Sequence, residues 1–460
     1  MRHLIITIML CSTFLSAQAQ GKFYVCTKYD SEGYNILGND SVFKEFIFND
    51  DRSEVTIHND TYEVADIDSI VFAPPAFPSV NVEWTEEGAT VTVDPSITGV
   101  SYKVNGGHVT ITSTNVKDEL LYVLSGKSSD GSLILNGSYK LTMHLDGVDL
   151  TSSKGAALHI ECGKRTEMKL MKGTVNSFTD RSNGTQKAAL YCKGHLEIKG
   201  KGTLNVKGNT KHALGVKEYL QLKSSTGTIN ILGAVTDGIH CGEGSRAVAD
   251  WENCRFIMNG GTVNIANCGS DCIDSDDYGS MYLNGGLIDM KVTQNDGCGL
   301  KCDSIIRMTG DTIRMEVSGK LARGIKAGYH SYFSGGVIEG TVSGPASMGI
   351  HTNKVTKTTG TVLKGGDIYF QGTDVKLDVS GTSDAGDDCY AIAIDGDYHQ
   401  SDGTVDVTVS NPASYGIDII GNYIQSGGTV HVKVNDPDAI DNGFYAGGEE
   451  TITGGTKTVE

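Results

Sequence analysis

The chain has 460 residues, with 59 glycines, 7 prolines, 38% hydrophobic residues and a formal net charge of −18. Its many Val, Ile and Thr residues argue against a disordered chain, and the missing Gly-X-Y repeat argues against collagen. The negative balance argues against nucleic-acid binding, because phosphate neutralisation requires a surplus of Lys and Arg. A single compact core would be unusual at this length, so we expect several domains or an elongated repeat.

The amino terminus has the features of a secretory signal peptide over residues 1–19. The apolar run from Leu4 to Leu15 is followed by a small-x-small cleavage site, Ala17-Gln18-Ala19. Cys11 leaves lipidation as a lesser alternative, because large residues precede it. No later segment reaches about 18 uninterrupted apolar residues. We therefore expect a monomeric secreted or periplasmic protein without a transmembrane segment, with display at the cell surface as an option.

The residues after the signal peptide differ in character from the rest of the chain. Residues 20–75 contain alternating strand-like runs and end in Asp68-Ser69-Ile70-Val71-Phe72, which predicts a small β module. A Pro-rich stretch follows and indicates a linker, which we place at 76–84. Strands predicted over 89–93 and 108–112 would cap the first open edge of the next domain.

The remainder of the chain, residues 85–455, repeats a unit of about 25 residues. Each unit opens with a small residue before Ile or Leu, and most close on Gly-Thr-Val-x-Val or a close variant. The steps between successive apolar anchors are 24, 25, 34, 27, 25, 25, 42 and 25 residues, and insertions over 246–254 and 352–388 explain the two long steps. The anchors are Leu190, Leu214, Ile239, Ile273, Leu300, Ile325, Ile350, Ile392 and Ile417.

A fixed period with period-2 alternation inside each unit indicates a solenoid of strands. Three short strands and tight glycine corners use about 25 residues, so we predict an all-β fold, a parallel β-helix with three strands per coil. Each coil would stack on the next at about 4.8 Å. Apolar residues would form inward columns, and the polar residues between them would point outward. Such outward residues are Asn205, Asn230, Asn264 and Asp289.

Ten cysteines follow the signal peptide, and an oxidising compartment permits disulfides among them. Cys192 and Cys241 occupy equivalent places in their repeats, with Val216 between them, so we interpret both as buried apolar residues. Four others lie close in sequence and could pair or, less readily, bind zinc, because clean C-x-x-C pairs are missing. They are Cys268, Cys272, Cys298 and Cys302.

Four stretches near the start of the repeats are distinctive. They are Val109 to Ser113, Val123 to Leu133, Leu145 to Thr151 and Gly155 to Ile160. With the Asp-Gly-Ile units that follow, residues 85–455 resemble a family of secreted bacterial carbohydrate-binding proteins whose right-handed parallel β-helix looks like that of pectate lyases. The resemblance implies binding of cellulose-like and acidic plant polysaccharides, and calcium as a cofactor. The region up to residue 75 resembles, over a short match, a small module at the front of secreted gut-type bacterial proteins.

A row of aspartates accompanies the apolar anchors of three coils. Stacked carboxylates about 4.8 Å apart repel one another unless a cation lies between them, and calcium takes six to eight oxygen ligands. We therefore predict one or more calcium sites within residues 237–303, with a solvated acidic loop as the alternative. The candidate ligands are Asp237, Asp271, Asp274, Asp276, Asp277, Asp296 and Asp303.

Three cations follow the acidic row: Lys301, Arg323 and Lys326. Both lysines come one residue after an apolar anchor, so we expect them to stack on one outer column. Beside calcium, the three cations form a candidate site for uronate carboxylates. The alternative is that they are surface charges balancing nearby Asp. A lyase would further require a Lys or Arg whose lowered pKa lets it take a proton.

Other candidate residues have a weaker case. A hydrolase would need paired carboxylates and a His, and Asp387-Asp388 lies in a long insertion without a fixed partner. We place His240, His330 and His351 in different registers and interpret them as surface histidines. Two pairs of tyrosines each share a register and could stack on sugars or inside the solenoid. The pairs are Tyr398 with Tyr423 and Tyr282 with Tyr332.

Together these features favour an exported, calcium-containing protein that binds acidic or cellulose-like polysaccharides without cleaving them. One alternative is a calcium-dependent polysaccharide lyase that acts on uronates by β-elimination. A second alternative is a structural surface or adhesion protein in which the solenoid is a spacer.

Overall fold

The structure is a computed structural model, and it describes residues 22–27, 30–35, 46–49, 53–57, 60–71, 77–242, 254–353 and 365–460. The signal peptide expected at 1–19 and parts of the insertions expected at 246–254 and 352–388 lie outside these residues. The chain divides into two compact units, Met1–Phe77 and Pro78–Glu460. Within the described part of the chain, no helix is long and apolar enough to cross a membrane.

The first unit contains two small antiparallel sheets. One joins β1 to β2 and β6, and the other places β4 between β3 and β5. The strands are β1 (Lys22–Thr27), β2 (Asp30–Asn35), β3 (Phe46–Phe48), β4 (Glu54–Ile57), β5 (Asp60–Glu63) and β6 (Ile67–Val71). Val25, Val55 and Ile57 form a core of their own. The alternating pattern of this region therefore does correspond to strands.

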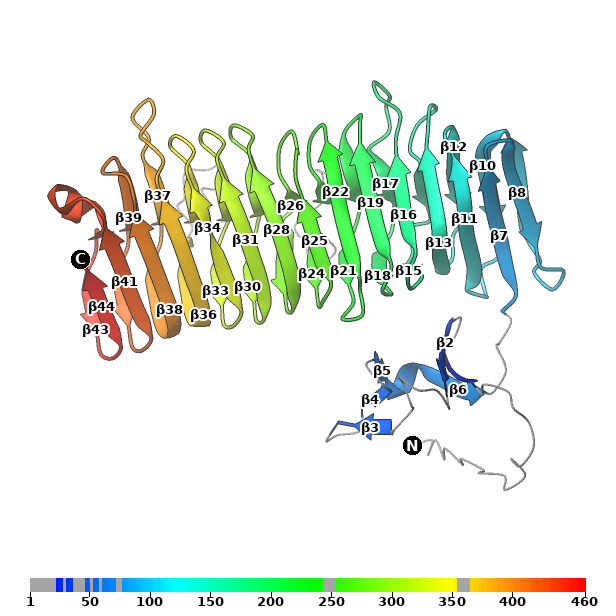
Figure 1. The fold of residues 1–460 in the computed structure, drawn as a ribbon, viewed down its shortest axis with the longest axis horizontal. Coiled ribbons are helices and arrows are strands. Elements are labelled where there is room, and N and C mark those ends of the chain that lie inside the picture. Colours follow the sequence, from blue (N-terminus) through cyan, green and yellow to red (C-terminus); the bar gives the residue numbers. More distant parts are fainter. Residues whose placement is uncertain are drawn as a thin grey trace. The chain divides into compact units, whose positions relative to one another are not determined.

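The second unit is a parallel β-helix, and the molecule forms a solenoid of about 13 turns. Figure 1 shows these turns stacked in chain order, each contributing strands to three faces. The fold class predicted from the 25-residue period is confirmed. Between the first and last turns, every strand of the solenoid pairs in parallel with its equivalent one turn on.

The first sheet carries the candidate site. It stacks β10 (Gly107–Ser113), β12 (Gly131–Asn136), β14 (Leu158–Glu161), β17 (Ala188–Cys192), β20 (His212–Val216), β23 (Ile239–Cys241), β26 (Ile273–Ser275), β29 (Cys298–Cys302), β32 (Arg323–Ala327), β35 (Met348–Thr352), β37 (Cys389–Ile394), β39 (Ser414–Ile419) and β42 (Phe444–Ala446).

The second and third sheets are joined by four long strands that pass through both. These are β11 (Leu120–Ser128), β13 (Leu141–Thr151), β36 (Ile368–Val379) and β38 (Tyr398–Val409). The second sheet also holds β15 (Thr166–Leu170), β18 (Leu196–Lys199), β21 (Leu220–Leu222), β24 (Arg255–Met258), β27 (Ser280–Leu283), β30 (Ile306–Met308), β33 (Ser331–Phe333), β40 (Tyr423–Gln425) and β43 (Glu450–Ile452). The third holds β16 (Val175–Thr179), β19 (Thr203–Gly208), β22 (Thr228–Ala234), β25 (Thr262–Ile265), β28 (Gly286–Val292), β31 (Asp311–Val317), β34 (Val337–Val342), β41 (Thr429–Val434) and β44 (Thr456–Val459).

The apolar anchors predicted from the repeat form one column of the core. Leu190 lies opposite Leu214, Leu214 opposite Ile239, and the register continues unbroken to Ile417. No anchor is more than 1% exposed. Burial of each such side chain contributes roughly 2 kcal/mol, so the column stabilises the stack of turns and fixes its register.

Polar residues between the buried positions of the third sheet form a ladder on the outer face. Asn230 donates from Nδ2 to Oδ1 of Asn205 at 2.8 Å, and Asn264 donates in the same way to Asn230 at 2.8 Å. Asp289 lies opposite Asn264. The outward column predicted from the repeat is therefore present, and its amides satisfy one another between turns.

Antiparallel hairpins close the first open edge of the solenoid. β7 (Ser79–Thr85) pairs with β8 (Gly88–Val93), and β9 (Val100–Asn105) pairs with β10. β7 also runs parallel to β11 and buries Val80, Val82 and Trp84. Because these alternating apolar residues belong to the core, β7 occupies much of the segment 76–84 that we expected to be a linker. At the other end, the 3-10 helix η3 (Pro437–Asn442) precedes the last turn.

Aromatic and sulfur side chains also fill the interior. The rings of Tyr398 and Tyr423 are fully buried with centroids 5.0 Å apart, and each phenol donates to a glutamine two residues on. This pair is therefore an internal stack and is not available to sugars. The ten described cysteines are buried, and Cys192 and Cys241 fill the core on either side of Val216, as predicted.

Candidate functional site

Polar side chains gather on the outer face of the first sheet, where β20, β23, β26 and β29 stack. One column consists of the residues that directly follow the anchors. Its members are Gly215, His240, Asp274, Lys301, Lys326 and His351. Lys301 and Lys326 thus lie opposite each other, as their spacing predicts. The assignment of His240 and His351 to different registers is wrong, because both follow an anchor by one residue.

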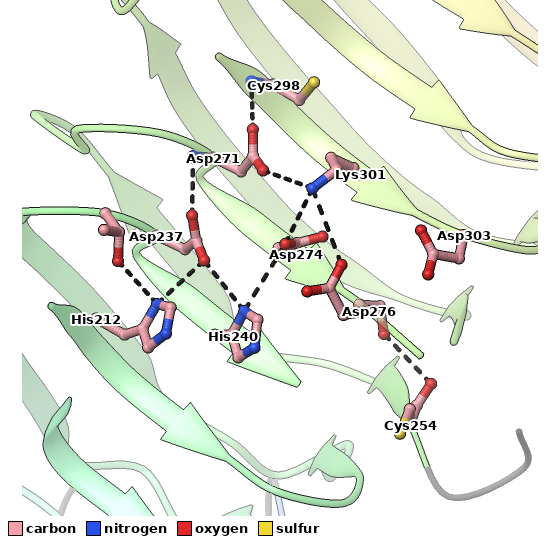
Figure 2. A network of polar contacts seen from close by, with 12 residues as sticks. His212, Asp237, His240, Cys254, Asp271, Asp274, Asp276, Cys298, Lys301 and Asp303 are labelled. Carbon is pink, nitrogen blue, oxygen red and sulfur yellow. Dashed lines mark hydrogen bonds and ion pairs between the residues drawn. The ribbon is translucent and has the colours of Figure 1, made fainter. Parts of the chain in front are cut away.

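A second column consists of the residues two positions before the anchors. It contains His212, Asp237 and Asp271, which come from three successive turns. Because the chain reaches the anchor from the same direction in every turn, the parallel register places these residues beside one another and near the first column (Figure 2). His212 was not among the predicted site residues, although its position two residues before Leu214 matches that of Asp237 before Ile239.

Asp237 is the acceptor at one end of the cluster and is only 6% exposed. Its Oδ2 atom lies 3.0 Å from Nδ1 of His212 and 3.0 Å from Nδ1 of His240 (Figure 2). The two imidazole rings stack with centroids 4.2 Å apart. Burial alone would raise the pKa of Asp237, but the hydrogen bonds from both histidines outweigh it and hold the pKa well below its usual range.

The two histidines differ in how they respond to this carboxylate. Burial lowers the pKa of His212, and the contact with Asp237 only partly offsets that effect. Burial acts in the same direction on His240, but Asp237 reverses it with help from Asp274, so the pKa of His240 is raised. His212 is therefore held neutral at physiological pH, while His240 takes up a proton more readily.

Lys301 is the cation at the centre of the acidic row. Its Nζ lies 3.0 Å from Oδ2 of Asp271, 3.1 Å from Oδ2 of Asp274 and 4.0 Å from Oδ1 of Asp276 (Figure 2). Burial would lower the pKa of Lys301, but Asp274 and Asp271 outweigh it and raise the pKa above the ordinary value. Lys301 is therefore protonated and supplies the positive charge that the stacked carboxylates require.

The outer end of the row contains Asp276, Asp277 and Asp303. Asp303 follows Cys302 as Asp276 follows Ser275, and these two strand residues pair across adjacent turns. The Tyr278 amide donates to Oδ2 of Asp303 at 3.2 Å. Burial is the main reason that the pKa of Asp303 is raised, and the negative charge of Asp276 adds to it. The negative charge of Asp277 acts on Asp303 in the same direction.

The structure separates the candidate calcium ligands into different environments. Among the described residues, ligand atoms within 4.8 Å of one another form three sets: His212 with Asp237 and His240, His240 with Asp274 and Asp276, and Asp237 with Asp271 and Asp274. Asp277, Asp296 and Asp303 are in none of them, and the Asp296 amide donates to the Lys320 carbonyl at 2.9 Å.

A calcium ion fits only part of the predicted ligand set. Asp237 faces imidazole nitrogens, and Asp271 and Asp274 already hold the ammonium group of Lys301. Because calcium takes only oxygen ligands and would have to displace that ammonium group, this buried part does not fit calcium. Asp276, Asp277 and Asp303 offer oxygen ligands alone, which matches the chemistry of calcium, but their ligand atoms form no set within 4.8 Å of one another among the described residues.

The three candidate sugar-binding cations also differ. Arg323 lies opposite Cys298, outside the lysine column, and donates from Nη1 to the carbonyl groups of Leu321 and, at 3.5 Å, Ala322. Burial lowers its pKa. Lys326 forms no ion pair with any residue that the structure describes. Its charge is therefore available to a ligand, whereas that of Lys301 is already neutralised.

Two of the comparisons with known proteins give the same description. The profile of the family "Carbohydrate-binding domain-containing protein" matches residues 105–460. A protein with this description from Acetivibrio thermocellus is 24% identical over 136 residues, which make up 27% of this chain and 48% of that protein. The chain therefore spans about half the length of that curated relative. A solved structure of the polysaccharide lyase-like protein from C. thermocellum, a gadolinium derivative, is 16% identical, with a TM-score of 0.28 over 83% of this chain and 97% of the other.

Proposed function

The chain belongs to the family of carbohydrate-binding domain-containing proteins, and from that premise we propose that it binds acidic polysaccharides without cleaving them. The proposed binding surface is the outer face of the first sheet around Lys326, next to Lys301. The observation that carries the proposal is the charge of Lys326, which has no ion pair among the described residues and stacks directly on Lys301 beside Asp271 and Asp274. We further propose that the protein acts outside the cytoplasm, as the expected signal peptide implies.

An acidic ligand is favoured by the contrast between this surface and the whole molecule. The chain carries a formal net charge of −18, which repels polyanions over most of its surface. Lys326 and His351 lie opposite each other on adjacent turns and offer nitrogen groups to an anionic ligand at this surface. A uronate polymer running along the sheet would place its carboxylates within reach of such a column, since the turns repeat at about 4.8 Å.

Binding without cleavage is supported by the protonation of the candidate bases. A lyase needs a base that gives up its proton near neutral pH. Asp274 and Asp271 raise the pKa of Lys301 and so oppose that role. Arg323 donates to backbone carbonyls, and a guanidinium group stays protonated in proteins even where burial lowers its pKa.

Calcium remains part of the proposal at the outer end of the acidic row. Asp276, Asp277 and Asp303 would hold the ion, which would neutralise their repulsion and attract a uronate carboxylate. In this arrangement the buried carboxylates of Asp271 and Asp274 continue to hold Lys301.

The proposal is tested by measuring the affinity of the full chain for a uronate polymer and for a neutral β-glucan, with and without a chelator. Lys326→Ala should weaken uronate binding about tenfold or more without changing the thermal midpoint. Lys433→Ala is the matched control, because Lys433 is exposed on the third sheet. Equal affinity of the two variants, or preference for the neutral polymer, would contradict the proposal.

The same samples separate binding from the two alternatives. Unsaturated products of β-elimination absorb in the near ultraviolet, and we expect none to accumulate over hours with calcium present. Steady product formation by the native chain would establish the lyase instead. Failure to bind any polymer would favour a solenoid that acts only as a structural spacer.

A further inference from the structure

The surface around Lys326 is bounded on both sides by carboxylates. Residues 317–338 and 340–353, which include β32 and β35, contain no Asp or Glu, whereas the turns before and after them carry carboxylates on the same face. We propose that the turns of β32 and β35 form a window for a single acidic sugar, so that the preferred ligand is a polysaccharide whose uronate residues are separated by uncharged ones. This inference rests on the proposed polysaccharide binding and specifies its substrate class.

A second outward column runs beside the one that contains Lys326 and shows where the window begins and ends. Its members follow the apolar anchors by three residues, and each backbone amide donates to the carbonyl group that ends the equivalent strand of the turn before. In successive turns the column contains Asp276, Asp303, Gly328, Asn353 and Asp395. The carboxylate is therefore replaced by glycine and asparagine in the turns of β32 and β35, and it returns in the next turn.

The carboxylates at the two edges lie close enough to act on a bound ligand. On one side, Oδ1 of Asp395 is 3.9 Å from Nε2 of His351. On the other side, Asp303 belongs to the turn of Lys301, whose ammonium group is already held by other carboxylates. The turns repeat at about 4.8 Å, which is within the Debye length of about 10 Å at 0.1 M salt. A ligand carboxylate placed one turn outside the window therefore meets repulsion that salt screens only in part.

Inside the window, several groups are available to one sugar residue. Lys326 supplies the charge, because it forms no ion pair with any residue that the structure describes. The buried Oδ1 atom of Asn353 has no hydrogen-bond partner in the described part of the chain, and a rotation of the amide lets it accept from a sugar hydroxyl. Gly328 has no side chain, so a sugar ring can approach the backbone beside Lys326.

The turn beyond His351 suits an uncharged sugar better than a second uronate. Its outward residues include Ala393, and the half-buried Tyr390 lies opposite Met348. Apolar and aromatic groups of this kind pack against the C–H groups of a sugar ring. Asp395 in the same turn and Asp418 one turn further would repel a carboxylate there. Alternation of charged and uncharged sugars therefore matches the surface better than a charge on every residue.

The test compares trisaccharides that differ only in methyl esterification. For both galacturonate and glucuronate, one form has only the central carboxylate free (the mono-acid), one has all three free (the tri-acid) and one has none. Isothermal calorimetry with the full chain at about pH 7.5 contains a chelator, so that no calcium ion masks the flanking carboxylates. We expect the mono-acid of at least one sugar to bind about tenfold or more tightly than its tri-acid, because the outer carboxylates meet like charges. The fully esterified form should bind more weakly than the mono-acid.

Asp303→Asn and Asp395→Asn test the two edges of the window. Each should raise the affinity for the tri-acid more than that for the mono-acid, whereas Asp289→Asn, on the exposed face of the third sheet, is the matched control and should raise neither. Equal or tighter binding of the tri-acid by the native chain, or an unchanged preference in both edge variants, would overturn the window and leave the proposed polysaccharide binding intact. Failure of the native chain to bind any of the trisaccharides would contradict the proposed binding surface itself.

Discussion

Single residues of the solenoid differ in how completely their buried charges are paired. Glu119 has only 2% of its side chain exposed, and it contacts Arg165 at 2.6 Å and Lys140 at 3.3 Å. Arg165 also contacts Glu167 at 3.2 Å and Glu197 at 3.7 Å. One guanidinium group therefore pairs with carboxylates from three different turns.

Removing that guanidinium group should be costly. We predict that Arg165→Ala lowers the free energy of unfolding by about 1.5–3 kcal/mol, because it removes a charged hydrogen-bond donor from the buried Glu119. Lys140, Lys199 and Lys223 remain beside the three carboxylates and limit the loss. Arg314→Ala is the control, since Arg314 pairs with Glu339 at 2.7 Å on the exposed face of the third sheet and should leave stability unchanged. Denaturant unfolding measures both variants, and equal losses would contradict the distinction.

Asp311 is a buried carboxylate that forms no ion pair with a cation in the part of the chain that the structure describes. It is fully buried, its Oδ1 accepts from the Thr312 amide at 3.0 Å, and its Oδ2 lacks a hydrogen-bond partner within the described residues. Burial raises its pKa to about 7. The unfolded chain therefore releases this proton at lower pH than the folded chain does, so the contribution of Asp311 to stability falls as pH rises from about 4 to about 7.

Asp311→Asn should remove this dependence. We predict that the variant matches the native chain below about pH 4 and exceeds its free energy of unfolding above about pH 8, by on the order of 2–4 kcal/mol. Unfolding curves of both proteins across this pH range measure the difference and cancel the contributions of other groups. A difference that stays constant with pH would show that Asp311 is not the titrating group.

Among the elements, the 25-residue period of the sequence predicted which strands stack on one another and which side chains form columns along them. The anchors, the outward Asn column and the lysine column depend only on register, and a parallel stack carries register from turn to turn without change. The burial of Asp311 could not be predicted in this way. The repeat places Asp311 opposite Gly286, but it does not reveal that the carboxylate is buried.

The candidate site was less predictable than the strands that carry it. The register of His212 and His240 was present in the sequence, since each has a fixed offset from an anchor. Their contact with one oxygen of Asp237 depends on side-chain rotamers and burial, which spacing does not encode. The contacts of Lys301 were equally unpredictable. Its ammonium group binds the carboxylates of Asp271 and Asp274, which the sequence analysis proposed as calcium ligands.

The asparagine ladder offers a test of pairing between elements. Asn230 donates to Asn205 and accepts from Asn264, so Asn230→Ala breaks two contacts between turns. We predict a loss of about 1–2 kcal/mol in the free energy of unfolding. Asp289→Ala, at the exposed end of the same column, is the control and should have a smaller effect. An equal loss in both variants would show that the ladder contributes nothing beyond side-chain packing.

For the whole molecule, the unbroken register predicts that an entire turn can be removed. Deletion of residues 323–347 takes out 25 residues and places Met348 where Arg323 lay, because these two residues are register partners. We expect the shortened chain to retain its β circular dichroism and cooperative unfolding, and to lose uronate binding with Lys326. Deletion of residues 323–335 takes out about half a turn and should prevent folding. Comparable folding of both would contradict a register set by complete turns.

The outer face of the first sheet is the surface that we propose to bind acidic polysaccharides. The most direct measurement is a crystal structure of the full chain with a bound oligouronate. The account predicts ligand density over β29, β32 and β35, with a uronate carboxylate at the Nζ atom of Lys326. Density confined to the second or third sheet, with the first sheet free of neighbouring molecules, would contradict it.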